Sequence, residues 1–428
     1  MNYFFHVVSK WYMGWAHRFS LMRAGPIAGS LTISFHRSEL ALQGDILKIL
    51  VIGGNRFFEM TVALFFCGAF AFTSQNAFAL KSESKVFESF DGFPLDGVIE
   101  WPETADRSLV NRVLVFIHGS GAQSMDEDLS AISTPKGVNN PFFKILSAAV
   151  VNQGWGTLRY NKRSFQFQEK IAATPEIKKA KHFLKFQKKP LEHFIRDAMS
   201  MALAAKREFP AAEVYVLGHS EGSTVALQAS RRQPQIKGHV LIGFSNESLN
   251  TLLLEQTVYR PLHLFTSLDK DLNEVLDVSE LGGKDEISKS LRDQMKILDL
   301  DEDKKLSMDE FKAGNYSNLV AKSDLIGADY QQEEAKLPRP SEILRETSKK
   351  TLFLQGTYDN QTPVYFTKAV DLVNRTSWKK KELRFVYFEK AGHTLDLRDS
   401  SNDLKFRVLG KETLARVGSE IQTFFQEP

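Results

Sequence analysis

The sequence predicts an α/β fold in which helices cover both faces of a doubly wound, mostly parallel sheet. Short apolar runs rich in β-branched residues alternate with segments of helical periodicity, and this alternation indicates parallel strands joined by crossover helices. Runs of this kind lie at 112–117, 156–160, 214–217, 238–244 and 351–354. Because the carboxyl ends of parallel strands meet at one edge, we expect reactive side chains to gather there.

The other elements follow from the same patterns. Residues 85–90 and 95–101 flank a D-G-F-P turn and predict an opening antiparallel pair of strands. A last strand is predicted over 383–388. Helical periodicity covers three further segments, which are 141–153, 191–209 and the closing helix at 412–425.

Length and composition indicate a globular protein with one large domain that carries insertions, or with two domains. The chain has 428 residues, of which 43% are hydrophobic and 25% are charged. Its net charge of +3 arises in residues 1–79, because acidic and basic residues balance in the remainder. This balance predicts no nucleic-acid partner. Cys67 is the only cysteine, which excludes an internal disulfide and a cysteine metal site.

The N-terminal region contains a signal-peptide pattern. Residues 61–73 form an apolar run that is too short to span a bilayer comfortably, and an A-x-A cleavage site follows at Ala77–Ala79. We therefore expect a mature chain that begins at Leu80, is periplasmic or secreted in a bacterium, and has no stable membrane span. Met60 directly precedes the run, so translation is expected to start near residues 50–60. A retained N-terminal anchor is the alternative.

The segment Glu213–Ala226, which reads E-V-Y-V-L-G-H-S-E-G-S-T-V-A, organises the rest of the chain. Its apolar start predicts a buried strand, and Ser223–Arg232 predicts a helix. A serine in G-x-S-x-G between a strand and a helix indicates a nucleophile elbow. Gly218 and Gly222 leave room for a tight, strained turn that exposes the Ser220 hydroxyl above the sheet edge.

With the elbow in this setting, the chain resembles the α/β-hydrolase fold family over residues 85–245 and 350–428. Family order is nucleophile, acid and histidine. Ser220 is followed by Asp359 in G-T-Y-D-N-Q-T-P and by His393 in A-G-H-T, each after a predicted strand. The resemblance implies that neutral His393 takes the proton from Ser220, while Asp359 fixes the histidine tautomer and stabilises the imidazolium.

The resemblance also implies an oxyanion site made of backbone N–H groups, one from Glu221 and one from Ser120 in H-G-S-G. More narrowly, V-F-I-H-G-S-G-A-Q-S-M-D-E-D and L-R-Y-N-K-R-S are similar to stretches of bacterial secreted or cell-associated esterases. Those stretches run H-G-S-G-x-x-x-x-D-E and L-R-Y-D-x-R-G, and Asn161 and Ser164 depart from the second. Asp396, just past the histidine, is a second nearby acid that the family order excludes.

Each candidate also has a structural interpretation. Ser220 could be a turn residue, Asp359 could cap a turn, and His393 could lie in a surface loop. His118 and His219 flank the predicted site, and we interpret both as structural residues that move no proton.

A long insertion separates the strand ending at Phe244 from the strand starting at Thr351. It has about a hundred residues, far more than the connection needs, and in the family this position holds a lid over the nucleophile. We therefore expect an N-terminal extension with a signal peptide over 1–79, a hydrolase core over 80–245 and 351–428, and a helical lid insertion over 246–350.

Two segments of this insertion fit the twelve-residue EF-hand loop, which binds Ca²⁺ through positions one, three, five, seven, nine and twelve. The candidate ligands of the first loop are Asp269, Asp271, Asn273, Val275, Asp277 and Glu280. The candidates of the second loop are Asp299, Asp301, Asp303, Lys305, Ser307 and Glu310. Leu276 and Leu306 match the hydrophobic residue at position eight.

Both loops depart from the pattern at position six. Glu274 and Lys304 replace the glycine that permits a positive φ, which costs about 1 kcal/mol or more. Two loops in tandem nevertheless match the usual pairing of EF-hands, so we expect weak, structural calcium binding. The alternative is an acidic helical lid with relic loops. Phe165–Lys189 is a second, lysine-rich insertion that we interpret as a solvated helical face, with contact to an anionic substrate or the cell envelope as the alternative.

Together these patterns predict a serine hydrolase that cleaves small-molecule carboxylic esters or thioesters through an acyl-enzyme. Catalysis needs no cofactor, and calcium would order the lid. Two alternatives stay open. One is a serine peptidase of the same fold, because the same triad also cleaves amides. The other is a calcium-responsive binding protein on an inactive hydrolase scaffold, against which the complete set of triad residues argues.

Overall fold

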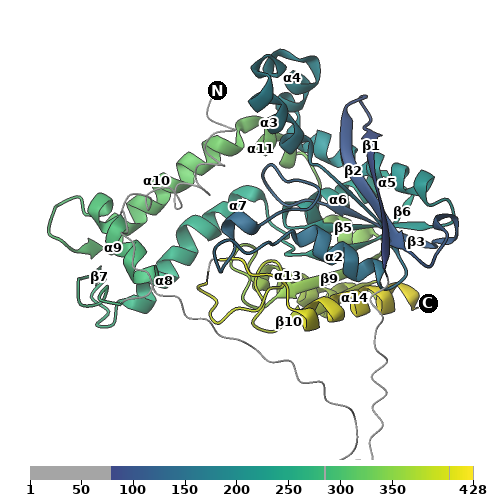
Figure 1. Cartoon of the computed structure of the whole chain (residues 1–428). Helices are drawn as coiled ribbons and strands as arrows, with labels where there is room; N and C mark the ends of the chain where they lie inside the picture. The colour runs from purple at the N-terminus through teal and green to yellow at the C-terminus, as the bar shows by residue number, and fades with distance from the viewer. Residues whose placement is uncertain (1–78, 284–285, 404, 428) are drawn as a thin grey trace, which may run out of the picture. The chain divides into compact units, whose positions relative to one another are not determined.

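The computed structural model of the chain describes residues 79–283, 286–403 and 405–427 (Figure 1). These residues all belong to one of two structural units, and the other unit, residues 17–76, lies outside the described part. The predicted signal peptide lies outside it as well. Within the described residues, no helix combines the length and the apolar character that a bilayer crossing requires.

Eight strands form the central sheet in the order β1-β2-β4-β3-β5-β6-β9-β10. Their bounds are β1 Leu80–Glu88, β2 Pro94–Pro102, β3 Arg112–Ile117, β4 Gly156–Tyr160, β5 Glu213–His219, β6 Ile236–Ile242, β9 Lys350–Gly356 and β10 Leu383–Phe388. β2 is antiparallel to both β1 and β4. The strands β4, β3, β5, β6, β9 and β10, in this order across the sheet, are parallel to one another. The predicted doubly wound, mostly parallel sheet is confirmed, and the chain has the α/β-hydrolase fold.

Helices cover both faces of this sheet. The connections between strands contain α2 Phe142–Val151, α3 Arg163–Ala173, α4 Lys181–Lys188, α5 Pro190–Glu208, α6 Glu221–Arg232 and α13 Val364–Val373, and α14 Lys411–Gln426 follows the last strand. Short 3-10 turns lie at Arg107–Leu109, Ser130–Ile132 and Pro175–Lys179, and a π-helical turn at Asn374–Trp378 extends α13.

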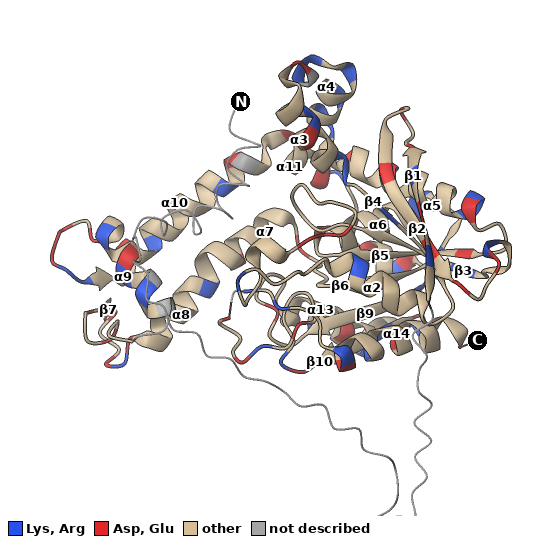
Figure 2. Cartoon of the chain, in the orientation of Figure 1, with Lys and Arg blue, Asp and Glu red and all other residues tan. Residues whose placement is uncertain are grey.

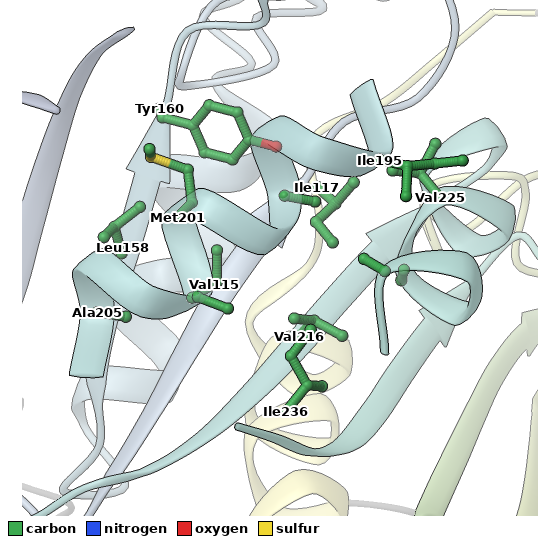
Figure 3. Packing of buried hydrophobic residues seen from close by; sticks show 14 of the residues in the cluster. Val115, Ile117, Leu158, Tyr160, Ile195, Met201, Ala205, Val216, Val225 and Ile236 are labelled. Carbon is green, nitrogen blue, oxygen red and sulfur yellow. The ribbon is translucent and has the colours of Figure 1, made fainter. Parts of the chain in front are cut away.

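The two faces of the central strands explain why these strands read as unbroken apolar runs. In β3, Val113, Val115 and Ile117 join the hydrophobic cluster that includes α5 and α6 (Figure 3). Leu114 and Phe116 join the cluster on the other face, with α2 and α14. Each of these five side chains is at most 3% exposed. Burial of one such side chain stabilises the folded state by about 1.5–3 kcal/mol. Both clusters therefore stabilise the sheet.

The stretch between β6 and β9 is helical. It contains α7 Leu249–Leu254, a π-helical turn at Glu255–Tyr259, α8 Arg260–Leu268, β7 Val275–Leu276, α9 Glu286–Leu298, β8 Leu306–Ser307, α10 Met308–Ile326, α11 Ala328–Glu334 and α12 Pro340–Glu346. Part of it has its own hydrophobic cluster, built around Phe265, Leu276, Leu306 and Phe311.

The lysine-rich segment forms α3, the turn at Pro175–Lys179, and α4. Phe183 and Phe186 of α4 are buried, while Lys181, Lys185 and Lys188 are exposed, and Figure 2 shows the basic residues of this helix in blue. The amphipathic pattern therefore buries its aromatic side and leaves its lysines in solvent, as the sequence indicated.

Candidate active site

Ser220 lies at the sharp turn between β5 and α6. Its backbone has φ 54° and ψ −122°, and its N–H donates to the Ile242 carbonyl oxygen at 2.9 Å. A Cβ on Gly218 would lie 2.3 Å from the Gly222 carbonyl oxygen, and a Cβ on Gly222 would lie 2.2 Å from the Ile117 oxygen. Both glycines are therefore required by close backbone approach, and the serine has the strained backbone of a nucleophile elbow.

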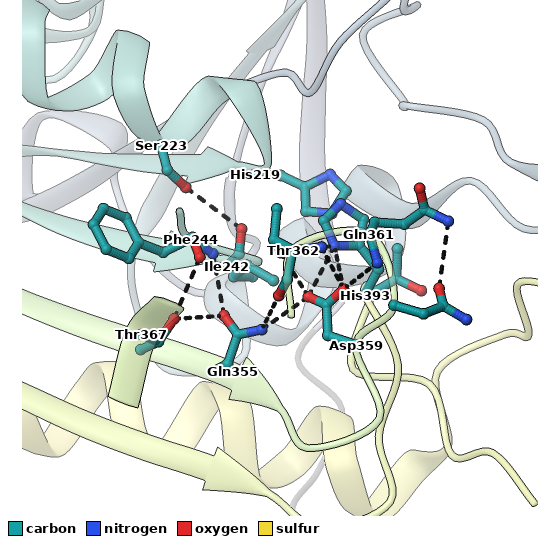
Figure 4. A network of polar contacts seen from close by, with 12 residues as sticks. His219, Ser223, Ile242, Phe244, Gln355, Asp359, Gln361, Thr362, Thr367 and His393 are labelled. Carbon is teal, nitrogen blue, oxygen red and sulfur yellow. Dashed lines mark hydrogen bonds and ion pairs between the residues drawn. The ribbon is translucent and has the colours of Figure 1, made fainter. Parts of the chain in front are cut away.

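Asp359 and His393 come from the loops that follow β9 and β10, and they meet at the same sheet edge (Figure 4). His393 Nδ1 lies 2.9 Å from Asp359 Oδ2 and 3.0 Å from Oδ1. Both residues are buried, at 4% and 5% exposure. A carboxylate on Nδ1 holds the imidazole in the tautomer that leaves Nε2 free to accept a proton.

Neighbouring groups hold the Asp359 carboxylate in place. Its Oδ1 accepts from the backbone N–H groups of Gln361 and Thr362, both at 2.9 Å. Its Oδ2 accepts from the side chains of Gln355 and Thr362, both at 2.8 Å. Burial raises the pKa of this carboxyl, but the charge of His393 and these hydrogen bonds outweigh burial, so the pKa lies below its usual range. Asp359 is therefore ionised at neutral pH.

Ser220 and His393 both border the end of β6. The Ser220 N–H binds Ile242, while a Cβ on the next residue, Gly243, would lie 2.6 Å from His393 Cε1. The ring of His219 lies 4.7 Å from the ring of His393. Among the hydrogen bonds of the described residues, none joins the Ser220 hydroxyl to His393. Ser220 and the Asp359–His393 pair thus come from distant parts of the chain and both lie at the end of β6.

The two predicted oxyanion donors flank the elbow. Glu221 is the first residue of α6, where backbone N–H groups have no intrahelical acceptor. Ser120 lies in the loop after β3, and a Cβ on the preceding Gly119 would lie 3.3 Å from Ser220 Cβ. Within the described part of the chain, neither the Ser120 nor the Glu221 N–H donates to a protein acceptor. Both amides are available to a bound oxygen.

The two histidines beside the site are buried and differ in their partners. His219 Nδ1 lies 2.6 Å from Glu127 Oε1, and both side chains are buried. Burial raises the pKa of Glu127, but the charge and hydrogen bond of His219 bring it below its usual range. Burial lowers the pKa of His118 to about 3, so its ring is neutral and packs edge-on to Tyr160.

The Asp396 carboxylate pairs with Arg398 and Thr394, and not with His393. Its Oδ2 lies 3.1 Å from the Arg398 Nε, and its Oδ1 accepts from the Thr394 hydroxyl at 2.8 Å. This pairing fits the sequence interpretation that Asp359, and not Asp396, orients the histidine.

Sequence reasoning did not single out Glu127, Lys162 or Tyr330, although all three contact the elbow region. Glu127 stands in the quoted D-E pair and Lys162 in L-R-Y-N-K-R-S. The Lys162 Nζ donates to the Gly119 carbonyl and to Glu221, while the Tyr330 hydroxyl donates to Glu221. The sequence signal for Glu127 and Lys162 was their place in these two quoted motifs, and Tyr330 stands in neither of them.

The two EF-hand-like loops lie side by side in the insertion. β7 pairs with β8 in antiparallel register, with Leu276 opposite Leu306 and Val275 opposite Ser307. The two hydrophobic residues at position eight therefore face each other across the ladder, which relates the loops as a pair. Figure 2 shows acidic residues, in red, on the loop beside β7 and on the loop beyond α9.

Matching residues of the two loops make matching contacts. Oε1 of Glu280 accepts from the N–H of Lys270, and Oε1 of Glu310 accepts from the N–H of Leu300, both at 2.7 Å. Position six has φ 60° in Glu274 and 65° in Lys304, so both residues have the left-handed conformation for which the pattern prefers glycine.

Carboxylates come together in both loops. One oxygen from each of Asp269, Asp271 and Glu280 lies within 4.8 Å of the others, and the same holds for Asp299, Asp301 and Asp303. Grouped carboxylate oxygens are the donors that hard cations such as Ca²⁺ prefer, so the donor chemistry of both loops fits calcium.

Comparison with known proteins agrees with this fold. A family model described as serine aminopeptidase S33 matches residues 184–396, a range that includes Ser220, Asp359 and His393. The match and the sheet topology agree that the chain has the α/β-hydrolase fold.

Known esterases and peptidases are among the similar proteins. Esterase EstD of Thermotoga maritima is 29% identical over 161 residues, which are 37% of this chain and 34% of that esterase. The match thus spans about a third of the length of this curated relative. Est1E of Butyrivibrio proteoclasticus has 13% identity and a TM-score of 0.42, covering 80% of this chain and 97% of its own. A puromycin-hydrolyzing peptidase of Mycobacterium tuberculosis has 13% identity and a TM-score of 0.45, with 82% and 39% covered.

Proposed function

We propose that the protein is a serine hydrolase that cleaves carboxylic esters or thioesters of small molecules through an acyl-enzyme. The observation that carries the proposal is the buried Asp359–His393 pair beside a strained serine at the carboxyl edge of the sheet. The 29% identity to an esterase supports an ester substrate. The stretch 246–350 would be the lid, and 80–245 with 351–428 the hydrolase core.

Each residue has one role in the proposed reaction. Ser220 Oγ attacks the substrate carbonyl carbon while its proton passes to His393 Nε2, and the N–H groups of Ser120 and Glu221 bind the carbonyl oxygen as it becomes negative. The bond to the leaving alcohol or thiol then breaks, and His393 protonates that group. Water repeats the attack on the acyl-enzyme, so Ser220 is restored and the acid is released. Asp359 stabilises the imidazolium in both halves, and no cofactor takes part.

Replacement of the nucleophile tests this proposal. We expect Ser220→Ala to lower kcat for p-nitrophenyl esters by about a thousandfold or more, because no other group can form the acyl-enzyme. A fluorophosphonate probe should label the wild type and fail to label Ser220→Ala. Ser164→Ala is the matched control, because this half-buried hydroxyl donates to the Gly121 carbonyl at 3.1 Å and, among the described residues, has no hydrogen bond to Ser220, Asp359 or His393. Hydrolysis by Ser220→Ala near the wild-type rate would refute the proposal.

The same experiment separates the two alternatives. A serine peptidase would be labelled by the probe but would cleave peptide amides in preference to p-nitrophenyl esters of every chain length. The peptidase description of the matching family model keeps this alternative open. A binding protein on an inactive hydrolase scaffold would neither be labelled nor cleave either class of substrate.

We also propose that the EF-hand-like loops bind calcium as a structural ion. The pairing of β7 with β8 supports this, because it relates the two sets of carboxylates as partners in one unit. Left-handed Glu274 and Lys304 weaken the site, so we expect affinity in the range of extracellular modules, about 10⁻⁴–10⁻³ M. Calorimetric titration of the whole protein should give heat at millimolar calcium, and a flat titration would refute calcium binding.

The compartment is a further part of the proposal. Export to the periplasm or beyond, with cleavage near Ala79, would place the loops where calcium is plentiful. N-terminal sequencing of the mature protein should read from Leu80.

A further inference from the structure

We propose that Lys162 is a positioning residue that aligns and polarises both oxyanion donors, an inference that rests on the proposed function. Lys162 follows β4 and is 5% exposed, which is rare for a lysine and requires partners. Its Nζ donates to the Gly119 carbonyl oxygen and to Glu221 Oε2, both at 2.7 Å. A third neighbour is the Phe194 ring, whose centroid lies 4.3 Å from Nζ.

The first bond acts on the Ser120 amide. The Gly119 carbonyl and the Ser120 N–H belong to one planar peptide unit, so a group that fixes the oxygen also fixes the direction of the N–H. An ammonium on that oxygen withdraws electrons from the amide, and the Ser120 N–H becomes a stronger donor. Lys162 therefore orients and strengthens this donor through the opposite end of its own peptide.

The second bond acts on the other donor. Glu221 provides the second predicted N–H from its backbone, and its side chain is held between Lys162 on Oε2 and Tyr330 on Oε1, the latter at 2.6 Å. This carboxylate is 8% exposed, so its partners are not exchanged freely for water. Tyr330 lies in α11, so the insertion itself contributes to the support of the first turn of α6.

The loop after β3, which carries Ser120, also holds the backbone around Lys162. Its N–H donates to the Gln123 carbonyl at 3.0 Å, and the side chain of the neighbouring Asn161 accepts from the Met125 N–H at 2.7 Å. The loop after β4 is thereby held against the loop that carries Ser120. Asn161, which departs from the esterase pattern, has a defined structural role in this contact.

The test replaces the ammonium without changing the length of the side chain much. We expect Lys162→Met to lower kcat for p-nitrophenyl acetate about 10- to 100-fold with KM within twofold of wild type, because the donors act mainly on the transition state. Affinity for a boronic acid, whose serine adduct is tetrahedral, should fall by a similar factor. Lys162→Gln, which stays polar but is too short for both partners, should lose at least tenfold and provides the test if the methionine variant does not fold.

Lys349→Met is the matched control, because Lys349 also donates to a backbone carbonyl, that of Ser230 at 2.6 Å. Ser230 lies near the far end of α6, about 14 Å along the helix from Glu221. This variant should keep kcat and boronate affinity even if stability falls.

A folded Lys162→Met or Lys162→Gln with kcat within threefold of wild type would overturn the inference while leaving the proposed function intact. Retained hydrolysis in Ser220→Ala would instead overturn the proposed function, and this inference with it.

Discussion

At the scale of single residues, close contacts around the candidate site leave no room for a methyl group. Gly243 has φ 60°, and its Cβ would lie 2.6 Å from His393 Cε1. A Cβ on Gly356 would lie 2.2 Å from the Ala391 carbonyl oxygen, in the loop that carries His393. These glycines set the position of the imidazole as directly as its hydrogen bonds do.

Gly243→Ala should therefore impair catalysis more than stability. The new methyl group would push the His393 ring away from Ser220, and we expect kcat to fall about a hundredfold, in line with the sensitivity of catalysis to small misplacements. The strained φ should cost about 1 kcal/mol or more of folding free energy. Ester hydrolysis and urea unfolding measure the two effects.

Gly154→Ala separates strain from steric contact. Gly154 has φ 87°, but nothing lies within 4 Å of a Cβ at this position. The control should lose similar stability and keep full kcat. Equal loss of kcat in both variants would show that strain, and not displacement of His393, causes the effect.

Motifs predicted the candidate triad, but not the residues that support it. The G-x-S-x-G turn indicated Ser220, and the resemblance to the α/β-hydrolase family implied Asp359 and His393 in the loops after two predicted strands. Lys162 bonds to Glu221 across 59 residues, and Tyr330 does so across 109. No local pattern encodes such pairs, since only the folded chain brings their partners together.

At the scale of elements, strands buried on both faces were the most predictable. β3 and β4 have the predicted bounds. Their apolar runs are unbroken because both faces of these parallel strands are buried, so the run and the strand begin and end together. β1 extends five residues before the predicted start at Lys85, as far as Leu80. Helix α13 was not predicted, because its sequence V-Y-F-T-K-A-V-D-L-V is rich in residues that also favour strands. Its helical form is settled by packing, through Val370, against the sheet.

The calcium proposal is testable at this scale. Because the residue at position twelve provides the bidentate contact, the double variant Glu280→Gln, Glu310→Gln should abolish the calcium-dependent heat and any calcium-dependent rise in Tm. Glu302→Gln removes a charge from the same loop at position four, which is not a ligand position, and should retain both signals. A double variant that still binds like wild type would show that these loops are not the site.

At the scale of the whole molecule, buried neutral histidines should make stability depend on pH. Burial lowers the pKa of His118 and of His239 to about 3, from an ordinary value of 6.5. Below pH 6.5 the unfolded chain binds protons that the folded chain does not. The free energy of unfolding should therefore fall as pH drops from 6.5 toward 3, by up to about 1.4 kcal/mol per pH unit for each histidine.

Urea unfolding of the wild type and of His239→Gln between pH 7.5 and 4.5 measures this slope. His239 lies in β6, where its Nδ1 is 2.9 Å from the Thr351 hydroxyl, so its loss need not disturb the candidate site. The free energy of unfolding of this variant should depend less steeply on pH than that of the wild type, by up to about 1.4 kcal/mol per pH unit, which is the contribution of one histidine. An unchanged slope would show that His239 is protonated in the folded protein or does not contribute.

The α/β class, the order of the core strands and the G-x-S-x-G turn at Ser220 could be predicted from the sequence, because periodicity and short turn motifs act over neighbouring residues, and the family resemblance added Asp359 and His393. The folded structure was needed to find the hydrogen bonds that hold Asp359 against His393, the positions of Lys162 and Glu127, and the alignment of the two acidic loops through β7 and β8. These features depend on side chains that meet across dozens of residues, and packing of the whole sheet with its insertion sets their distances.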